Sequence, residues 1–252
     1  MKNSTLKNLR KIELSGELML DLPGQLATAS SGGKRLYNPP GSTHCYLTLS
    51  NAKSTAFSRV TEVFPVENLI IGFYEWDYIL DVYDTEEKYG ELLDTFWAAG
   101  VRNVVQYDFS VWYQEDEEKR LMNMYRNFRY MEIAQQKGFH TLLNFNNIML
   151  KYMSVYKEIL PKKLNTVVID ANHSESAYSR HESIALNALL EDFGVHSVIV
   201  RTGKRITKRL QYILVPCKAH NAQVLYSPTE MYFMAFSQKQ VRELQGQNEP
   251  VL

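Results

Sequence analysis

One stretch decides the fold class: NVVQYDFSVWYQEDEEKRLMNMYRNFRYMEIAQQKG, residues 103–138. It begins with a short apolar run typical of a strand buried on both faces, and Asp108 and Ser110 stand where that run ends. After an acidic turn, apolar residues repeat at helix spacing before Gly138: Leu121, Met124, Tyr125 and Phe128. The stretch therefore predicts a strand, a polar loop and an amphipathic helix that stops at a glycine.

The same unit recurs along the chain. Helix-period segments also precede Gly100 and Gly194. Short apolar runs typical of strands occupy residues 44–50, 69–74, 103–108, 140–145, 166–170, 196–201, 210–215 and 222–226. Alternation of this kind is typical of βα units on a parallel sheet. We predict an α/β fold, specifically a small or incomplete TIM-like (β/α) barrel, with an open doubly wound parallel sheet as the alternative.

Local composition divides the chain into three parts. Residues 24–44 are rich in Gly, Ser, Pro and Asn, so we expect residues 1–66 to form an N-terminal arm with a loop-rich segment. The α/β domain is expected over residues 67–230, and residues 231–252 are expected to form a C-terminal helix or tail.

Composition excludes several classes of protein. The 252 residues carry 28 Lys and Arg against 28 Asp and Glu, so no global field attracts nucleic acid or an anionic membrane. Two cysteines without ligand spacing indicate neither a zinc site nor a disulfide framework. No apolar run is long enough to span a bilayer. We expect a cytoplasmic protein with no membrane association.

Polar residues follow several of the predicted strands, at the edge where parallel sheets bind ligands. Asp77, Asp108, Asp170 and His173 are the side chains that we expect to hold a divalent metal, Mg or Mn. Asp108, Asp170 and His173 are the expected catalytic residues, acting with a metal-activated water. Taken singly, each such residue is equally typical of a turn or a helix N-cap.

A basic segment follows one of these strands. In VIVRTGKRITKRL, Arg201, Thr202, Lys204 and Arg205 could receive a phosphate, although a solvated run of charge would look the same. Arg126, on the helix of the opening stretch, is a fifth candidate for phosphate, or it pairs with the acidic turn EDEE at 115–118.

The order of these features resembles a family of uncharacterised proteins from bacteriophages and other bacterial mobile elements. The shared pattern is an acid after the first strand, a DFS motif, an N-x-Y-R helix and a Q-x-x-G turn. In this chain the acid is Asp77 and the DFS motif is Asp108 to Ser110, while the helix residues are Asn123, Tyr125 and Arg126, and the turn residues are Gln135 and Gly138. The resemblance covers about residues 67–210. It implies a phage or plasmid context in the cytoplasm of a bacterial host cell and a shared polar site, but no reaction.

Three hypotheses on function follow. The first is a mobile-element protein that binds or hydrolyses a phosphate-bearing ligand, nucleic acid or nucleotide, and if it is an enzyme it is a metal-dependent phosphodiester or phosphate hydrolase. The second is a non-catalytic module that binds a host or phage protein. The third is a metal-free enzyme that acts on a small molecule at the mouth of the barrel.

Overall fold

A single mixed sheet organises the protein. The computed structural model describes residues 2–14, 20, 22, 25–29, 36–75, 77–111, 115–171, 179–202 and 208–228. Within them the nine-stranded sheet has the order β2-β1-β3-β4-β5-β6-β7-β8-β9. Only β2 runs antiparallel to its described neighbour, and all other pairs are parallel. The strands are β1 (Gln25–Ala29), β2 (Leu36–Tyr37), β3 (Ser42–Thr48), β4 (Leu69–Gly72), β5 (Asn103–Val105), β6 (His140–Asn144), β7 (Thr166–Asp170), β8 (Ser197–Thr202) and β9 (Gln223–Pro228).

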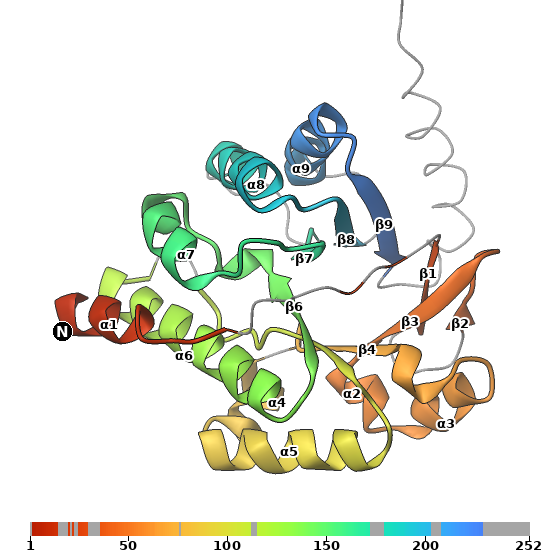
Figure 1. The fold of residues 1–252 in the computed structure, drawn as a ribbon. Coiled ribbons are helices and arrows are strands. Elements are labelled where there is room, and N and C mark those ends of the chain that lie inside the picture. The colour runs from red at the N-terminus through yellow and green to blue at the C-terminus, as the bar shows by residue number, and fades with distance from the viewer. Residues whose placement is uncertain are drawn as a thin grey trace, which may run out of the picture.

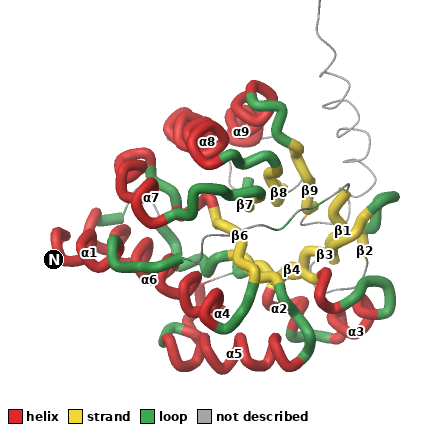
Figure 2. Tube along the Cα trace, viewed as in Figure 1, coloured by secondary structure: helices red, strands yellow, loops and turns green. Residues whose placement is uncertain are grey.

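Helices join the parallel strands and cover the outer face of the sheet (Figures 1 and 2). The α-helices are α1 (Lys2–Leu9), α2 (Leu49–Ala52), α3 (Thr55–Thr61), α4 (Asp77–Leu80), α5 (Glu86–Ala98), α6 (Glu117–Gln136), α7 (Met153–Ile159), α8 (Ser179–Phe193) and α9 (Lys208–Ala219). Short 3-10 turns are η2 (Val66–Asn68), η3 (Asp81–Tyr83), η4 (Phe145–Asn147) and η5 (Leu150–Tyr152). Of the described helices, none has the combination of length and hydropathy that crossing a bilayer requires.

The sheet curls until its first and last parallel strands meet. Thr28 Oγ1 on β1 donates a hydrogen bond of 3.0 Å to Ser227 Oγ on β9. At this end of β1 the main chain pairs with β2 and not with β9, through Thr28 and Ala29. The predicted TIM-like barrel is therefore confirmed, in an incomplete form in which side chains join the two ends.

One layer of apolar side chains fills the inside of the curl. Each parallel strand contributes a residue to this layer: Leu26, Tyr46, Ile70, Val105, Leu142, Val168, Ile199 and Leu225. Leu22 packs against them, and the carbonyl of Leu20 accepts a bond from Thr166 Oγ1 at the start of β7. Two larger clusters lie between the sheet and the helices. The strands are thus buried on both faces, as their near-continuous apolar runs indicate.

The three predicted helix-glycine-strand units are present. Gly100, Gly138 and Gly194 follow α5, α6 and α8 with φ of +96°, +91° and +68°. A residue with a Cβ is strained in this left-handed region, so glycine ends each helix and turns the chain into the next strand.

The expected strand at 210–215 is wrong, because these residues lie inside α9. Leu210, Ile213 and Cys217 are buried at helix spacing. Since β8 and β9 are parallel neighbours, the chain between them has to cross back along the sheet, and a helix is the usual form of that crossover. Asn221, with φ of 53°, takes the place that glycine holds after the other helices.

The N-terminal part of the chain contributes directly to the sheet. Residues 25–29 and 42–48, which we expected in an arm, form β1 and β3, and β3 pairs with β4. The C-terminal helix or tail expected at 231–252 lies outside the described residues.

Candidate functional site

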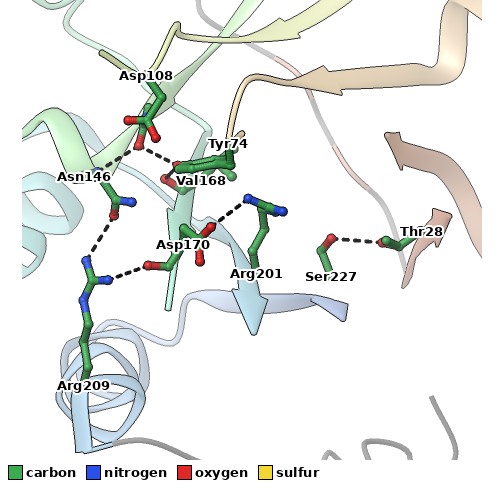
Figure 3. Close-up of polar contacts among 10 residues, drawn as sticks. Thr28, Tyr74, Asp108, Asn146, Val168, Asp170, Arg201, Arg209 and Ser227 are labelled. Atoms are coloured by element: carbon green, nitrogen blue, oxygen red, sulfur yellow. Dashed lines mark hydrogen bonds and ion pairs between the residues drawn. The ribbon is translucent and has the colours of Figure 1, made fainter. Parts of the chain in front are cut away.

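Polar side chains gather at the carboxyl edge of the curled sheet (Figure 3). Asn144 and Asp170 are the last residues of β6 and β7, and Arg201 is the penultimate residue of β8. Tyr74 and Asp108 follow β4 and β5. This is the edge at which the parallel-strand topology predicts a site.

A chain of hydrogen bonds connects three of these residues. The Tyr74 hydroxyl donates to Asn144 Oδ1 at 2.5 Å and approaches the Val168 carbonyl at 3.0 Å. Asn144 Nδ2 in turn donates to Asp108 Oδ1 at 2.7 Å. Asn144 is wholly buried, whereas Asp108 is partly exposed. The Asp108 carboxylate is thus held by a side chain from the neighbouring strand and faces the open edge of the sheet.

Helix α6 fixes the loop that carries Asp108. The wholly buried Asn127 accepts a bond of 2.8 Å from the Phe109 N–H and donates one of 2.9 Å to the Phe109 carbonyl. Asn123, one turn earlier, donates to the carbonyl of Ser110 at 2.7 Å. Asn127 also donates to Asn147 Oδ1 at 2.7 Å. The N-x-Y-R helix and the DFS motif are therefore in contact, and the asparagines of the helix set the course of the DFS loop.

Asp170 and Arg201 form a buried ion pair. Arg201 NH1 donates to Asp170 Oδ2 at 2.7 Å, and the two side chains are 7% and 10% exposed. The guanidinium also lies over the Tyr74 ring, 4.8 Å from its centroid. Such a pair contributes little net stability because desolvation offsets the attraction, but losing either partner would leave an unpaired buried charge.

A second buried arginine joins this edge to the helices. Arg209 on α9 forms a two-pronged ion pair with Glu182 on α8, with Nε and NH2 each 3.0 Å from a carboxylate oxygen. Its NH1 donates to the Asp170 carbonyl at 2.6 Å, and its NH2 to Asn146 Oδ1 at 3.1 Å. Glu182 is 9% exposed, and it pairs with Arg209 across 27 positions of sequence.

Two tyrosines line the inside of the site. Burial raises the pKa of the Tyr46 phenol, and Arg201 opposes that rise. Burial and the charge of Asp108 raise the pKa of Tyr74. Both hydroxyls therefore stay protonated at neutral pH, so each carries a proton that it can donate.

The structure brings together only some of the expected metal ligands. Asp108 and Asp170 lie at the same edge, and Asp77 begins α4, but the side chain of Asp77 and all of His173 lie outside what is described. Within the described part of the chain, no group of three or more His, Cys, Asp or Glu is placed to hold an ion.

The expected phosphate-binding residues do not form a described cluster. Arg201 is paired with Asp170, and Thr202 is 8% exposed at the end of β8. Arg126 lies on the outer layer, where it donates to the Asp84 carbonyl at 2.9 Å and stacks on the Phe109 ring at 3.5 Å. Arg126 therefore contacts these outer residues and not the EDEE turn. Within that turn, Glu117 pairs with Lys151. Lys204 and Arg205 lie outside the described residues.

No protein-family model and no curated protein matches the chain. Among solved structures, the chain is similar to a crystal structure of D-allulose 3-epimerase from Methylomonas sp., with 10% sequence identity, a TM-score of 0.47, and coverage of 84% of this chain and 87% of that chain. At this level of similarity no substrate, metal or residue role is transferred from that enzyme to this chain. The resemblance to the mobile-element family is not addressed by these comparisons and stays a prediction.

The predicted function of a phage or plasmid-type protein that binds or hydrolyses nucleic acid or nucleotide is wrong. The physical reason lies in the basic side chains, because Arg201 is committed to Asp170 and Arg209 to Glu182. Buried cations that are already neutralised have no charge left to offer a phosphate.

Sequence reasoning missed Tyr46, Gln106 and Asn127. Tyr46 alternates with Cys45 and Leu47 on β3, so a sheet with one buried face would direct it to solvent. In the curled sheet that second face is the interior. Gln106 accepts bonds from the Asn144 N–H at 3.2 Å and from Asn147 Nδ2 at 3.4 Å. Its signal was a polar residue inside the predicted strand at 103–108, two positions before the end of that run.

Proposed function

We propose that the chain binds a small, neutral, polyhydroxylated molecule, of the sugar class, at the carboxyl edge of the curled sheet. The observation that carries this proposal is the hydrogen-bonded chain from Tyr74 through Asn144 to the partly exposed Asp108. Ionised carboxylates accept hydrogen bonds, and amides both donate and accept, so together they suit hydroxyl groups, which also do both. The proposal corresponds to the third hypothesis, a small-molecule site at the barrel mouth.

The charges at this edge favour a neutral ligand over a phosphate ester. Arg201 is neutralised by Asp170 and Arg209 by Glu182, while the Asp108 carboxylate has an amide neighbour in Asn144. A phosphate would meet the negative charge of Asp108 with no uncommitted cation among these residues to offset it. A sugar hydroxyl, by contrast, donates directly to that carboxylate.

Ligand-observed NMR titration tests this proposal. The ligands are neutral sugars and polyols, each paired with its phosphate ester, measured in EDTA and again with Mg or Mn. We expect the neutral compounds to bind at least as tightly as their esters. We also expect the affinity to be the same in EDTA, because Arg201 already neutralises Asp170.

The Asp108→Asn variant locates the site. The amide keeps the shape of the side chain and an oxygen for the bond from Asn144, but it removes the charge, so we expect binding to weaken about tenfold. Asp94→Asn is the matched control, since Asp94 is an exposed acid on the outer helix α5 that pairs with Lys137. Tighter binding of the phosphate esters, or equal weakening in both variants, would contradict the proposal.

A further inference from the structure

Two buried hydrogen-bond donors inside the sheet lack an acceptor. The Tyr46 hydroxyl and Arg201 Nε have no hydrogen-bond partner among the residues that the structure describes. Tyr46 is 1% exposed and Arg201 is 6% exposed. Buried polar groups in proteins are almost always satisfied, so a pair of such donors points to an acceptor that is not part of the described chain.

The side chains that carry these two donors are neighbours inside the curl. Tyr46 stands on β3, and its ring crosses onto β4, where a Cβ added to Gly72 would lie 1.6 Å from the hydroxyl oxygen. The Arg201 guanidinium, from β8, lies 5.5 Å from the centroid of the same ring and 4.8 Å from that of Tyr74. Strands from opposite parts of the curl therefore bring the Arg201 guanidinium up to the Tyr46 ring. The absence of a side chain at Gly72 makes the space for this arrangement.

We infer that the Tyr46 hydroxyl and Arg201 Nε together bind one oxygen acceptor of the ligand, and that this acceptor is a neutral carbonyl oxygen. The inference rests on the proposed function and names the substrate class of the same site as a polyhydroxylated carbonyl compound. Two donors without acceptors match the two lone pairs of a carbonyl. Because both donors are shielded from solvent, these bonds form in a low-dielectric environment, where they are stronger than in water.

The surrounding charges distinguish a carbonyl from a carboxylate. Among the described residues, Arg201 is the cation that acts on the Tyr46 hydroxyl, and Asp170, Glu75 and Asp108 are the carboxylates that act on it. In that part of the chain acids therefore outnumber bases around the hydroxyl, and a carboxylate ligand would add to the repulsion. A neutral carbonyl accepts the same two bonds without that cost.

Three four-carbon ligands test this assignment. Erythrulose carries a free carbonyl because its chain is too short to close into a ring, erythritol is its reduced form, and erythronate is a related anion. Ligand-observed NMR titration of the full chain measures their affinities. We expect erythrulose to bind about five to ten times more tightly than erythritol, the effect of gaining one or two hydrogen bonds. Erythronate is expected to bind no better than erythritol.

The variant Tyr46→Phe removes one donor and keeps the ring. We expect it to bind erythrulose as weakly as erythritol and to melt at no lower temperature than the wild type, since the hydroxyl has no described partner to lose. Tyr89→Phe is the matched control. Tyr89 is also wholly buried with a hydroxyl that lacks a described partner, but it lies in the outer cluster, stacked on Tyr130.

The outcomes separate this inference from the proposed function. A preference for erythrulose that is lost in Tyr46→Phe and kept in Tyr89→Phe supports the inference. The inference is overturned if the wild type binds erythrulose and erythritol equally, or if Tyr46→Phe keeps the preference. The proposed function would then still stand, and the acceptor for the two donors would be a trapped water. If neither these compounds nor the larger sugars bind, both the inference and the proposed function are wrong.

Discussion

Asn127 on α6 holds the backbone of Phe109 from both sides, accepting from its N–H at 2.8 Å and donating to its carbonyl at 2.9 Å. The side-chain amide thereby imitates a neighbouring strand where β5 has ended and no ladder continues. Phe109 directly follows Asp108, so this contact sets the direction in which the Asp108 carboxylate leaves the sheet. Asn127 is therefore a positioning residue for the candidate site.

Replacing Asn127 by Asp is expected to destabilise the fold. The change has almost no effect on shape, but it removes the donor to Phe109 and Asn147 and places a buried negative charge against two oxygen acceptors. We expect a loss of about 3 kcal/mol in the free energy of unfolding, measured by urea denaturation. Asn8→Asp, at an exposed position of α1, is the control and should change stability by less than about 0.5 kcal/mol. Similar losses in both variants would contradict the role of Asn127.

Gly72→Ala should be destabilising because of Tyr46. The new Cβ would lie 1.6 Å from the Tyr46 hydroxyl oxygen and 2.2 Å from Cζ, so the ring would have to move. We expect the double variant with Tyr46→Leu to lose less stability than the sum of the two single variants, with a coupling of at least about 1 kcal/mol by thermal or urea unfolding.

A second glycine provides the control for that measurement. A Cβ at Gly90, inside α5, would meet only the flexible end of Lys137, at 3.5 Å. Gly90→Ala should therefore stabilise the protein by about 0.5–1 kcal/mol through helix propensity. Additive losses in the Gly72 and Tyr46 double variant would show that the ring is not where the structure places it.

Arginine and lysine should not be interchangeable at position 209. Lysine keeps the charge but cannot contact Glu182, the Asp170 carbonyl and Asn146 together as Arg209 does. We expect Arg209→Lys to cost about 2–4 kcal/mol of unfolding free energy. Arg129→Lys, at a more exposed arginine that pairs with Glu86 and Glu132, should cost less than about 1 kcal/mol. Equal costs would mean that burial does not control the contribution of these pairs.

Stability should fall in alkaline solution through the two buried thiols. Burial raises the pKa of Cys45 and of Cys217 from the ordinary 9.0 to about 12. Above pH 9 the unfolded thiols lose protons while the folded ones retain them, so the unfolded state is favoured increasingly until about pH 12. Within that window each thiol lowers the free energy of unfolding by up to about 1.4 kcal/mol per pH unit.

Urea unfolding at pH 8 and at pH 10.5 measures this slope. The Cys45→Ala and Cys217→Ala double variant should be less stable at both values, because it leaves small cavities, but it should lose less stability between them. A slope equal to that of the wild type would assign the alkaline loss to tyrosines, among which the buried Tyr130 and the half-buried Tyr226 also have a pKa raised to about 12.

The fold was largely predictable because its strands are buried on both faces and joined by helices that stop at glycine. The apolar runs at 69–74, 103–108, 140–145 and 166–170 correspond to β4, β5, β6 and β7. Helix α9 was mistaken for a strand because its stop is Asn221 and its exposed face carries the apolar residues Tyr212 and Val215. Both features hide the contrast that normally distinguishes an amphipathic helix.

The site was predictable only as a set of positions. Strand ends pointed to Asp108, Asp170 and Arg201, and these do lie at one edge. Their partners did not follow from the sequence, because pairings such as Tyr74 with Asn144 and Arg209 with Glu182 join residues 70 and 27 positions apart. Such contacts depend on the curvature of the sheet, which no local pattern specifies.

The bond between Thr28 and Ser227 joins residues 199 positions apart. On the ribosome, β1 emerges long before β9, so the inside of the curl remains an open trough while most of the chain is being made. Leu26, Tyr46 and Ile70 would stay partly uncovered until Leu225 arrives to complete their layer. A nascent chain stalled before β9 would therefore expose a continuous apolar surface, the kind of surface that chaperones recognise.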